Sequence, residues 1–245
     1  YIQRRGIHIA CLQETHLAKG EPTKLQRGWR GRVYATETSV YAKGALIWVR
    51  SGVPFEASIV KIDTEGRWVF ILGKLNGRDV TLGSIYAPNL GQLEFLSSVS
   101  TVLQVLDTEC MLLNGDFNCV LDINLDRSIP PLVGAPAYKI ARKITNWMRN
   151  WHLEDIWRVQ HSNVPEYSFY SQVHGVHVRL DRILCTDTIC ASFLDSEYLV
   201  RTYSDHNPQS VSSSHGPLKG TLKLGRDPSP VPQWRLQPEQ WRLVT

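Results

Sequence analysis

The feature that most constrains the fold of this chain is the stretch at residues 111–118, Met-Leu-Leu-Asn-Gly-Asp-Phe-Asn. Its apolar start is typical of the end of a fully buried strand, and Gly115 predicts a tight turn directly after that strand. We expect the turn to bring Asp116 and Asn118 to the C-terminal edge of a sheet, where open α/β sheets carry their chemistry. A carboxylate and an amide there could orient or deprotonate a water molecule, although Asn-Gly-Asp is also common in hairpin turns.

The composition predicts one soluble globular domain with a tail. The chain has 245 residues, and 42% of them are hydrophobic, which is sufficient for a sizeable core. Its formal net charge of +4 fits an anionic partner but is too small to indicate one alone. Five cysteines without C-x-x-C spacing predict neither disulfides nor structural zinc, and they favour a reducing intracellular compartment, nuclear or cytoplasmic. No stretch has the pattern of a signal peptide or a membrane span, so we expect no membrane association.

A second strand pattern brings another carboxylate to the edge of a sheet. Residues 7–12 read as a buried strand and are followed by Gln-Glu-Thr-His, so we expect Glu14 to lie at the end of that strand as Asp116 does. A carboxylate in this position is a hard oxygen ligand suited to Mg²⁺, and the plainer alternative is a solvated or capping glutamate. His16 could be a further ligand, but a loop histidine more often has no such role.

The middle of the chain predicts several strands before a helix, which indicates a layered α/β or α+β architecture. Short strands are expected at residues 45–49, 68–72 and 80–86, with turns such as Asn76-Gly77 between them, and a helix at residues 93–106. Because Pro88 cannot extend a central strand, Tyr86 and Asn89 should lie at an edge. A phenol and an amide there could hydrogen-bond a phosphate or its pentacovalent transition state.

The segment at residues 18–43 is polar and predicts a loop. Basic residues in it alternate with aromatic ones: Lys19, Lys24, Arg27, Arg30 and Arg32 lie around Trp29 and Tyr34. Basic residues interleaved with aromatic ones suit contact with a phosphate backbone, and a solvated loop with two packing aromatics explains the pattern at least as well. Residues 138–151 have the apolar spacing of an amphipathic helix, and we interpret the cations of that helix first as a solvated face and second as a DNA contact.

Two stretches near the C-terminus predict a carboxylate–histidine pair. Residues 176–184 alternate imperfectly around Arg-Leu-Asp, which places Asp181 inside or at the end of a strand, where an ionised carboxylate needs a partner. The run Tyr-Ser-Asp-His, ending at His206, can supply that partner. A histidine held by a buried carboxylate is fixed in one tautomer and can stabilise a developing oxyanion or protonate a leaving group. Asp205 could add an acidic ligand to a metal, although Ser-Asp-His is also compatible with a helix cap or a loop.

Five short motifs occur in one order along the chain, and their combination is more specific than any one of them. They are Gln-Glu-Thr at 13–15, Tyr-Ala-Pro-Asn at 86–89, Asn-Gly-Asp-Phe-Asn at 114–118, Arg-Leu-Asp at 179–181 and Ser-Asp-His at 204–206. In this order they resemble the endonuclease/exonuclease/phosphatase superfamily, with its apurinic endonuclease branch as the nearest broad match. Residues 11–17, 85–89, 125–128 and 167–169 resemble in particular the endonuclease domain of LINE-type non-LTR retrotransposons.

The resemblance implies an α/β fold, a four-layered sandwich of two facing mixed sheets with outer helices. It also implies a role for each matching residue: Glu14 and Asp205 at a divalent metal, Mg²⁺ or Mn²⁺, Asp116 with Asn118 on the attacking water, Tyr86 and Asn89 on the phosphate, and Asp181 holding His206. The implied reaction nicks one DNA strand and leaves a 3′ hydroxyl for target-primed reverse transcription. DNA would be the partner, together with a fused reverse transcriptase in a full-length relative.

Two alternatives and one departure accompany this resemblance. The alternatives are an apurinic-site repair endonuclease of the same superfamily, and a degenerate or co-opted domain that binds nucleic acid without cutting it. The family begins with a strand whose Asn helps to hold the metal, and no such strand precedes Glu14 here. We therefore expect residues 1–211 to form an N-terminally truncated, monomeric domain that is weak or inactive as a fragment, and residues 212–245 to form a linker or tail.

Overall fold

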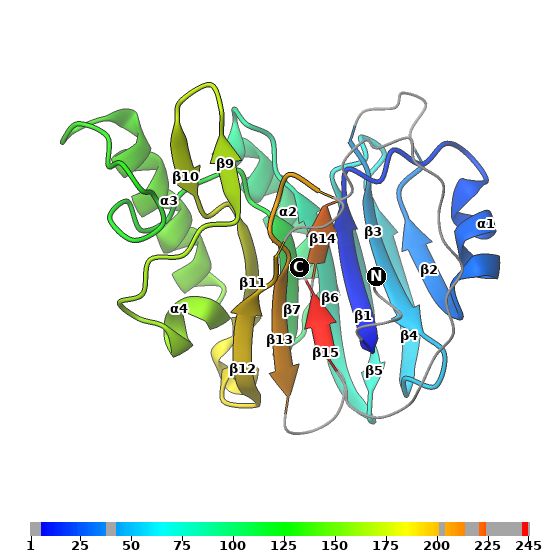
Figure 1. The fold of residues 1–245 in the computed structure, drawn as a ribbon. Coiled ribbons are helices and arrows are strands. Elements are labelled where there is room, and N and C mark those ends of the chain that lie inside the picture. The colour runs from blue at the N-terminus through cyan, green and yellow to red at the C-terminus, as the bar shows by residue number, and fades with distance from the viewer. Residues whose placement is uncertain (1–5, 38–42, 201–203, 214–220, 224–241, 245) are drawn as a thin grey trace.

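Two β-sheets stacked face to face, with helices on both outer sides, make up the structure (Figure 1). The computed structural model describes residues 6–37, 43–200, 204–213, 221–223 and 242–244. Within them, no helix is long and apolar enough to cross a membrane.

The first sheet is built around β1. Its strand order is β14-β1-β3-β2, with β15 also paired to β1; the bounds are Ile7–Gln13 for β1, Gly31–Ala35 for β2, Ala45–Arg50 for β3, Thr221–Lys223 for β14 and Arg242–Val244 for β15. β3 is antiparallel to β1, whereas β14 and β15 run parallel to it. The edge of β1 opposite β3 thus carries backbone pairs from the C-terminal segment.

The second sheet has six strands in the order β4-β5-β6-β7-β11-β8. Their bounds are Phe55–Ile62, Trp68–Leu75, Arg78–Tyr86, Met111–Asp116, Asp181–Thr186 and Leu153–Asp155, respectively. β6 and β7 are parallel, and every other neighbouring pair is antiparallel. The strands predicted at residues 45–49, 68–72 and 80–86 are confirmed as β3, β5 and β6. The edge strand β4 was not predicted, because most of its side chains are exposed and its sequence lacks a clear alternation.

Two short hairpins and five helices complete the described residues. The hairpins pair β9 (Phe169–Ser171) with β10 (Val176–Val178), and β12 (Phe193–Tyr198) with β13 (Gln209–Ser213). The helices are α1 (Glu21–Gly28), α2 (Gln92–Leu106), α3 (Pro136–Asn150), α4 (Ile156–Gln160) and α5 (Asp187–Cys190). The two longest, α2 and α3, confirm the helices expected at residues 93–106 and 138–151.

Three apolar clusters separate four layers, as expected for the fold class. The cluster between the sheets contains Ile47 of the first sheet and Leu82 of the second. A second cluster packs the outer face of the six-stranded sheet against α2 and α3, and a third packs the outer face of the first sheet, around Trp48, against α1. Burial of this apolar surface is the main force that holds the layers together.

The loop predicted for residues 18–43 is wrong for half of its length, and residues 38–42 of that segment lie outside the described residues. Residues 21–28 form α1, with Pro at the start of the helix, and residues 31–35 form β2. Leu25 and Trp29 pack against the first sheet, and the Trp29 and Trp48 rings meet edge to face at 6.1 Å. The sequence did not predict α1 because the segment is polar and α1 has no buried residue.

Gly115 lies inside β7 rather than in the turn that the sequence predicted. Its φ of 149° is a backbone conformation that L side chains rarely adopt, and a Cβ atom there would lie 1.8 Å from the carbonyl oxygen of Ile85 on β6. Glycine is needed because β6 and β7 approach each other closely at this point. Asp116 is consequently the last residue of the strand, held by the ladder itself.

Candidate active site

Tyr86, Asp116 and Asp181 lie in one row across three adjacent strands. The strand register pairs Tyr86 of β6 with Asp116 of β7, and Asp116 with Asp181 of β11. β11 is antiparallel to β7, so its first residue meets the last residue of β7. The sequence placed Asp181 inside or at the end of a strand, and the structure corrects this: β10 and β11 are separate strands, and Asp181 begins the second.

Asp181 and His206 form the pair that the sequence predicted. The Nδ1 atom of His206 lies 2.6 Å from Oδ2 of Asp181, and both residues are 3% exposed. The backbone of His206 is bridged to that of Phe169, whose ring lies 4.6 Å from the imidazole. With Nδ1 donating to a carboxylate, the ring orientation and tautomer are fixed and Nε2 is the nitrogen that can exchange a proton.

Asp116, Asp181 and His206 could also hold a metal ion. One ligand atom from each of the three lies within 4.8 Å of the others, and Asp116 is fully buried. Two carboxylates and an imidazole are donors that a divalent cation accepts. The sequence predicted different metal ligands, Glu14 and Asp205.

The structure places Glu14 beside Tyr86. The Tyr86 hydroxyl donates a hydrogen bond of 2.5 Å to Oε1 of Glu14, and the backbone of Glu14 has a φ of 51° as the chain leaves β1. Gln13, directly before it, donates from Nε2 to Oγ of Ser84 on β6 at 3.0 Å. The end of β1 is thereby held against the end of β6, and a carboxylate of the first sheet reaches the row on the second.

Asn118 and Asn89 lie on two loops that a buried glutamine joins. The backbone N–H of Asn118 donates to Oδ1 of Asp116 at 2.8 Å, and its side-chain amide donates to the carbonyl of Ala87 at 2.7 Å. Gln92 donates from Nε2 to the carbonyl oxygens of Asn89 and Asn118. Both loops are thus tied together beside Asp116, with Asn89 exposed.

Asp205 is exposed and directly precedes His206. The predicted residues therefore fall into a buried group, Asp116, Asp181 and His206, and a more open group, Glu14, Tyr86, Asn89, Asn118 and Asp205. The oxygen donors among them fit a hard divalent cation such as Mg²⁺.

A buried ionic network behind Asp181 was not found from the sequence. Arg179 and Arg182, on either side of Leu180-Asp181, bind the carboxylates of Asp126 and Asp155. Burial raises the pKa of Asp126, but the charges of Arg182 and Arg179 outweigh it and hold that pKa well below its usual range. The available signal was the pair of arginines, Arg179 and Arg182, on either side of Leu180-Asp181.

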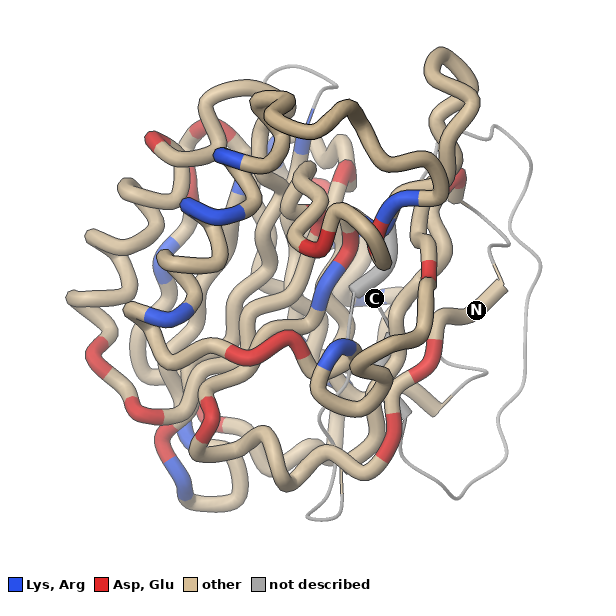
Figure 2. The backbone as a smooth tube through the Cα atoms, turned by 90° about the vertical axis from the view of Figure 1, so that its left-hand side faces the viewer, with Lys and Arg blue, Asp and Glu red and all other residues tan. Residues whose placement is uncertain are grey.

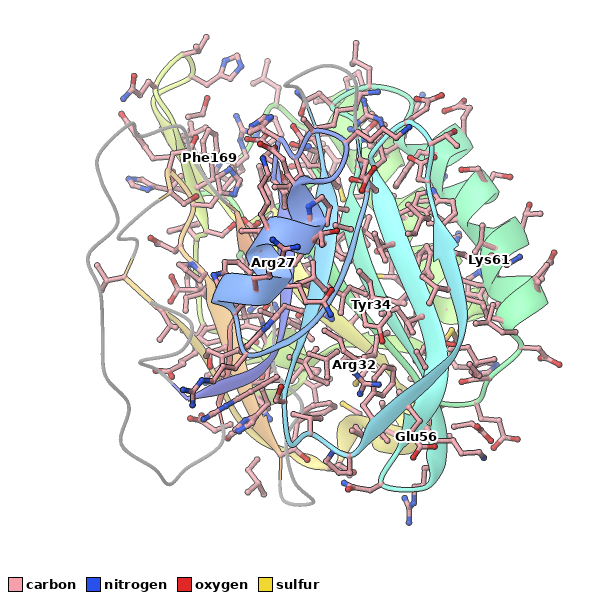
Figure 3. All side chains as sticks on the ribbon, turned by 90° about the vertical axis from the view of Figure 1, so that its right-hand side faces the viewer. Arg27, Arg32, Tyr34, Glu56, Lys61 and Phe169 are labelled. Carbon is pink, nitrogen blue, oxygen red and sulfur yellow. The ribbon has the colours of Figure 1, made fainter. Side chains whose placement is uncertain are left out.

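Two basic residues of the α1–β2 region, Arg27 and Arg32, lie away from the end of the molecule that carries His206. In Figure 3, Phe169 marks the end of the molecule that carries His206, whereas Arg27 on α1 and Arg32 on β2 lie progressively further from it. The guanidinium of Arg32 donates to the carbonyl of Phe55 and sits over its ring. On the side of the molecule that carries α3 and α4, Figure 2 shows basic and acidic residues on the same face.

Comparisons with known proteins show the family and the fold of the chain. Residues 1–206 match the family model described as the Endonuclease/Exonuclease/phosphatase family. The chain is 26% identical over 223 residues to the "Transposon TX1 uncharacterized 149 kDa protein" of Xenopus laevis. That match covers 89% of the chain but only 17% of the relative, so the chain spans about a sixth of the relative's length.

Solved structures share the fold at low sequence identity. An AP endonuclease from Leishmania major superposes with a TM-score of 0.69 at 18% identity, over 82% of this chain and 77% of that one. An AP endonuclease from Archaeoglobus fulgidus gives 0.68 at 20% identity, over 84% and 89% of the two chains. A 3′-5′ exonuclease from Neisseria meningitidis gives 0.61 at 17% identity with the same coverage.

Proposed function

Because the chain belongs to the endonuclease/exonuclease/phosphatase family, we propose that it is a divalent-metal-dependent endonuclease that nicks one strand of DNA. The observation that carries the proposal is the single row of Tyr86, Asp116 and Asp181, with His206 bonded to the last of these. A nucleophile-orienting carboxylate, a phenol and a carboxylate-held imidazole at one edge are the parts that phosphodiester hydrolysis needs.

In the proposed reaction, Asp116 accepts a proton from the attacking water or orients it. The Asn118 N–H fixes the carboxylate for this task. Water attacks phosphorus as the bond to the 3′ oxygen breaks, and His206 gives the proton that makes this oxygen a 3′ hydroxyl. Tyr86 and Asn89 bind the phosphate, and Asp181 keeps the imidazole in one tautomer. General acid–base assistance of this type contributes roughly 10² to 10⁴-fold.

Glu14 and Asp205 would hold Mg²⁺ or Mn²⁺ in this proposal. When bound, the ion neutralises charge on the phosphate. The hydrogen bond from Tyr86 to Glu14 supports a shared position of metal and phosphate, because it joins the expected ligand to the expected phosphate contact. In this proposal the buried group of Asp116, Asp181 and His206 serves proton transfer and does not bind the metal.

The transposon relative supports a retroelement context for the nick. We propose that the 3′ hydroxyl primes reverse transcription, and that a reverse transcriptase is fused to this domain in the full-length protein. The domain itself is then a DNA-binding monomer that supplies one cut.

A plasmid-nicking assay tests the proposal. We expect supercoiled DNA to be converted to the open circle with Mg²⁺ and not with a chelator, and Asp116→Asn and His206→Ala to lose the activity. Asp79→Asn is the matched control, because Asp79 is exposed and sits near the opposite end of β6 from Tyr86. Cleavage of abasic DNA alone would replace the retroelement role by repair. DNA binding without cleavage in any metal would replace the enzyme by a binding domain.

A further inference from the structure

Asp126 is the centre of a buried ionic cluster that the proposed reaction does not use. Its carboxylate, 0% exposed, accepts hydrogen bonds from three guanidinium groups. Arg179 donates from Nε at 2.8 Å and Nη2 at 3.1 Å, Arg182 donates from Nη2 at 3.1 Å, and Arg158 donates from Nη2 at 2.6 Å. Asp155 is the second carboxylate of the cluster, 2.7 Å from Nη2 of Arg179. Three cations, Arg158, Arg179 and Arg182, therefore face two anions, Asp126 and Asp155.

The cluster surrounds the two residues directly before Asp181. β10 ends at Val178 and β11 begins at Asp181, so Arg179 and Leu180 lie between the two ladders. The Arg179 N–H donates to the carbonyl of Asp126 at 2.9 Å, and Arg182 donates from Nη1 to the carbonyl of Leu180 at 3.1 Å. The cluster thus fixes the backbone directly before Asp181.

Tyr198 links the same cluster to Asp181 from the other side. Its hydroxyl donates to the carbonyl of Asp181 at 2.7 Å and lies 3.5 Å from Nη1 of Arg179. A shift of Arg179 would therefore displace both ends of the segment formed by Arg179 and Leu180. The side chain of Asp181 lies 2.6 Å from Nδ1 of His206, a short contact that leaves little tolerance for such a shift.

We propose that Asp126 is a positioning residue for the Asp181–His206 pair; this inference rests on the proposed function. Removing its charge leaves three guanidinium groups facing one carboxylate, and two of these groups, on Arg179 and Arg182, are buried. A buried charge that loses its partner is strongly destabilising, so the arginines must separate or draw in water. Either change moves Arg179, then Leu180 and Asp181, and lengthens the contact to His206.

Asp126 belongs to the Leu-Asp-Arg-Ser run at residues 125–128, which the proposed reaction leaves without a role. The rest of this run supports the same placement. Arg127 is bridged to Val178 of β10, and the Ser128 N–H donates to the carbonyl of His177 at 3.0 Å. These backbone contacts set the run beside β10. Asp126 then faces Arg179 and Arg182, which follow β10 in the chain.

The test compares Asp126→Asn with Asp122→Asn in the whole chain. Asp122 lies in the same loop, where its Oδ1 accepts the N–H groups of Asn124 and Leu125, a task that an amide oxygen can also perform. The first readout is the downfield proton NMR signal of the His206 Nδ1–H group, recorded below the melting temperature of each variant. We expect this signal to move upfield or exchange away in Asp126→Asn and to stay unchanged in Asp122→Asn.

The second readout separates kcat from KM in the nicking assay. Because a displacement on the order of 1 Å near the reacting groups can lower the rate by about 10²-fold, we expect kcat to fall by 10- to 100-fold in Asp126→Asn. KM should change by less than about twofold, because the phosphate contacts lie on β6 and its following loop. An unchanged NMR signal in folded Asp126→Asn would overturn the inference.

A second variant covers the case in which Asp126→Asn does not fold. Arg158→Gln removes one partner of Asp126 from a side chain that is 19% exposed. We expect a smaller shift of the same NMR signal and a smaller loss of kcat, and no change in either would count against the inference. The NMR readout needs no activity, so a chain that never nicks DNA would refute the proposed function and still allow the positioning of His206 to be tested.

Discussion

Replacing Gly115 by alanine tests whether the close approach of β6 and β7 builds the site. The new Cβ would lie 1.8 Å from the carbonyl oxygen of Ile85, and ordinary van der Waals contact begins at 3.4 Å, so the strands must separate by about 1.6 Å. That is about a third of the normal spacing between neighbouring strands. The row that must open holds Tyr86 and Asp116.

The expected cost follows from the contacts that this separation breaks. The Ala87 N–H donates to the carbonyl of Asp116 at 2.8 Å directly beside the clash. Losing this bond and its neighbour costs about 0.5–1.5 kcal/mol each, and a non-glycine residue at a φ of 149° adds roughly 1–2 kcal/mol. We expect Gly115→Ala to lower the free energy of unfolding by about 2–5 kcal/mol, out of the 5–15 kcal/mol typical of a domain.

Urea unfolding followed by tryptophan fluorescence measures this difference. The matched control is Gly134→Ala, because Gly134 also has a positive φ, 88°, but a Cβ atom added there would have no heavy atom within 4 Å. The control should lose only the backbone term, about 1 kcal/mol. If both variants are destabilised equally, the steric argument for β6 and β7 is refuted.

Three further predictions concern the hydroxyl of Tyr86, the charge of Asp126 and the reactivity of the cysteines. Tyr86→Phe removes the hydroxyl that binds Glu14, and we expect about a 10- to 100-fold loss of nicking with a change in the free energy of unfolding below 1 kcal/mol, measured by the plasmid assay and urea titration. The lowered pKa of Asp126 means that its stabilisation is complete above the ordinary value of 3.8 and is lost as the pH falls below it. Acid titration of Asp126→Asn should therefore show a smaller pH dependence of stability below that value. Burial raises the pKa of Cys11 to about 12 and that of Cys119 to about 11, so alkylation at pH 8 followed by mass spectrometry should label both more slowly than Cys190, whose pKa its contact with Cys185 lowers.

The parts of the site that the sequence predicted are those with a short local signal. Asp116 follows a buried apolar run. Pro88, two residues after Tyr86, cannot continue a strand, so both edge positions could be derived from neighbours in the chain. The pairing of Asp181 with His206 was predicted because a carboxylate in a strand needs a partner, although 25 residues separate them. The roles of these residues stay proposals.

The parts that the sequence did not predict depend on contacts between distant segments. Asp126 and Arg179 are 53 residues apart, and nothing near either one shows that they meet. Gln13 and Gln92 look like ordinary surface residues in the sequence, but they join elements at the site. Gly115 was misread because glycine serves turns and close strand contacts equally well, and only the position of β6 decides between them.

Asp181 shows why the rule about strand ends must be applied to the sheet and not to each strand. Chemistry is expected where parallel strands end, and β6 and β7 follow that rule with Tyr86 and Asp116. β11 runs in the opposite direction, so its first residue reaches the same edge. The backbone before that first residue lies outside the β7–β11 ladder and is held by individual contacts, among them the Phe117 N–H, which donates to the carbonyl oxygen of Leu180 at 3.1 Å. A site that uses the start of an antiparallel strand therefore needs a separate support for the preceding backbone. The hydrogen bonds that Arg179 donates to Asp126 provide one.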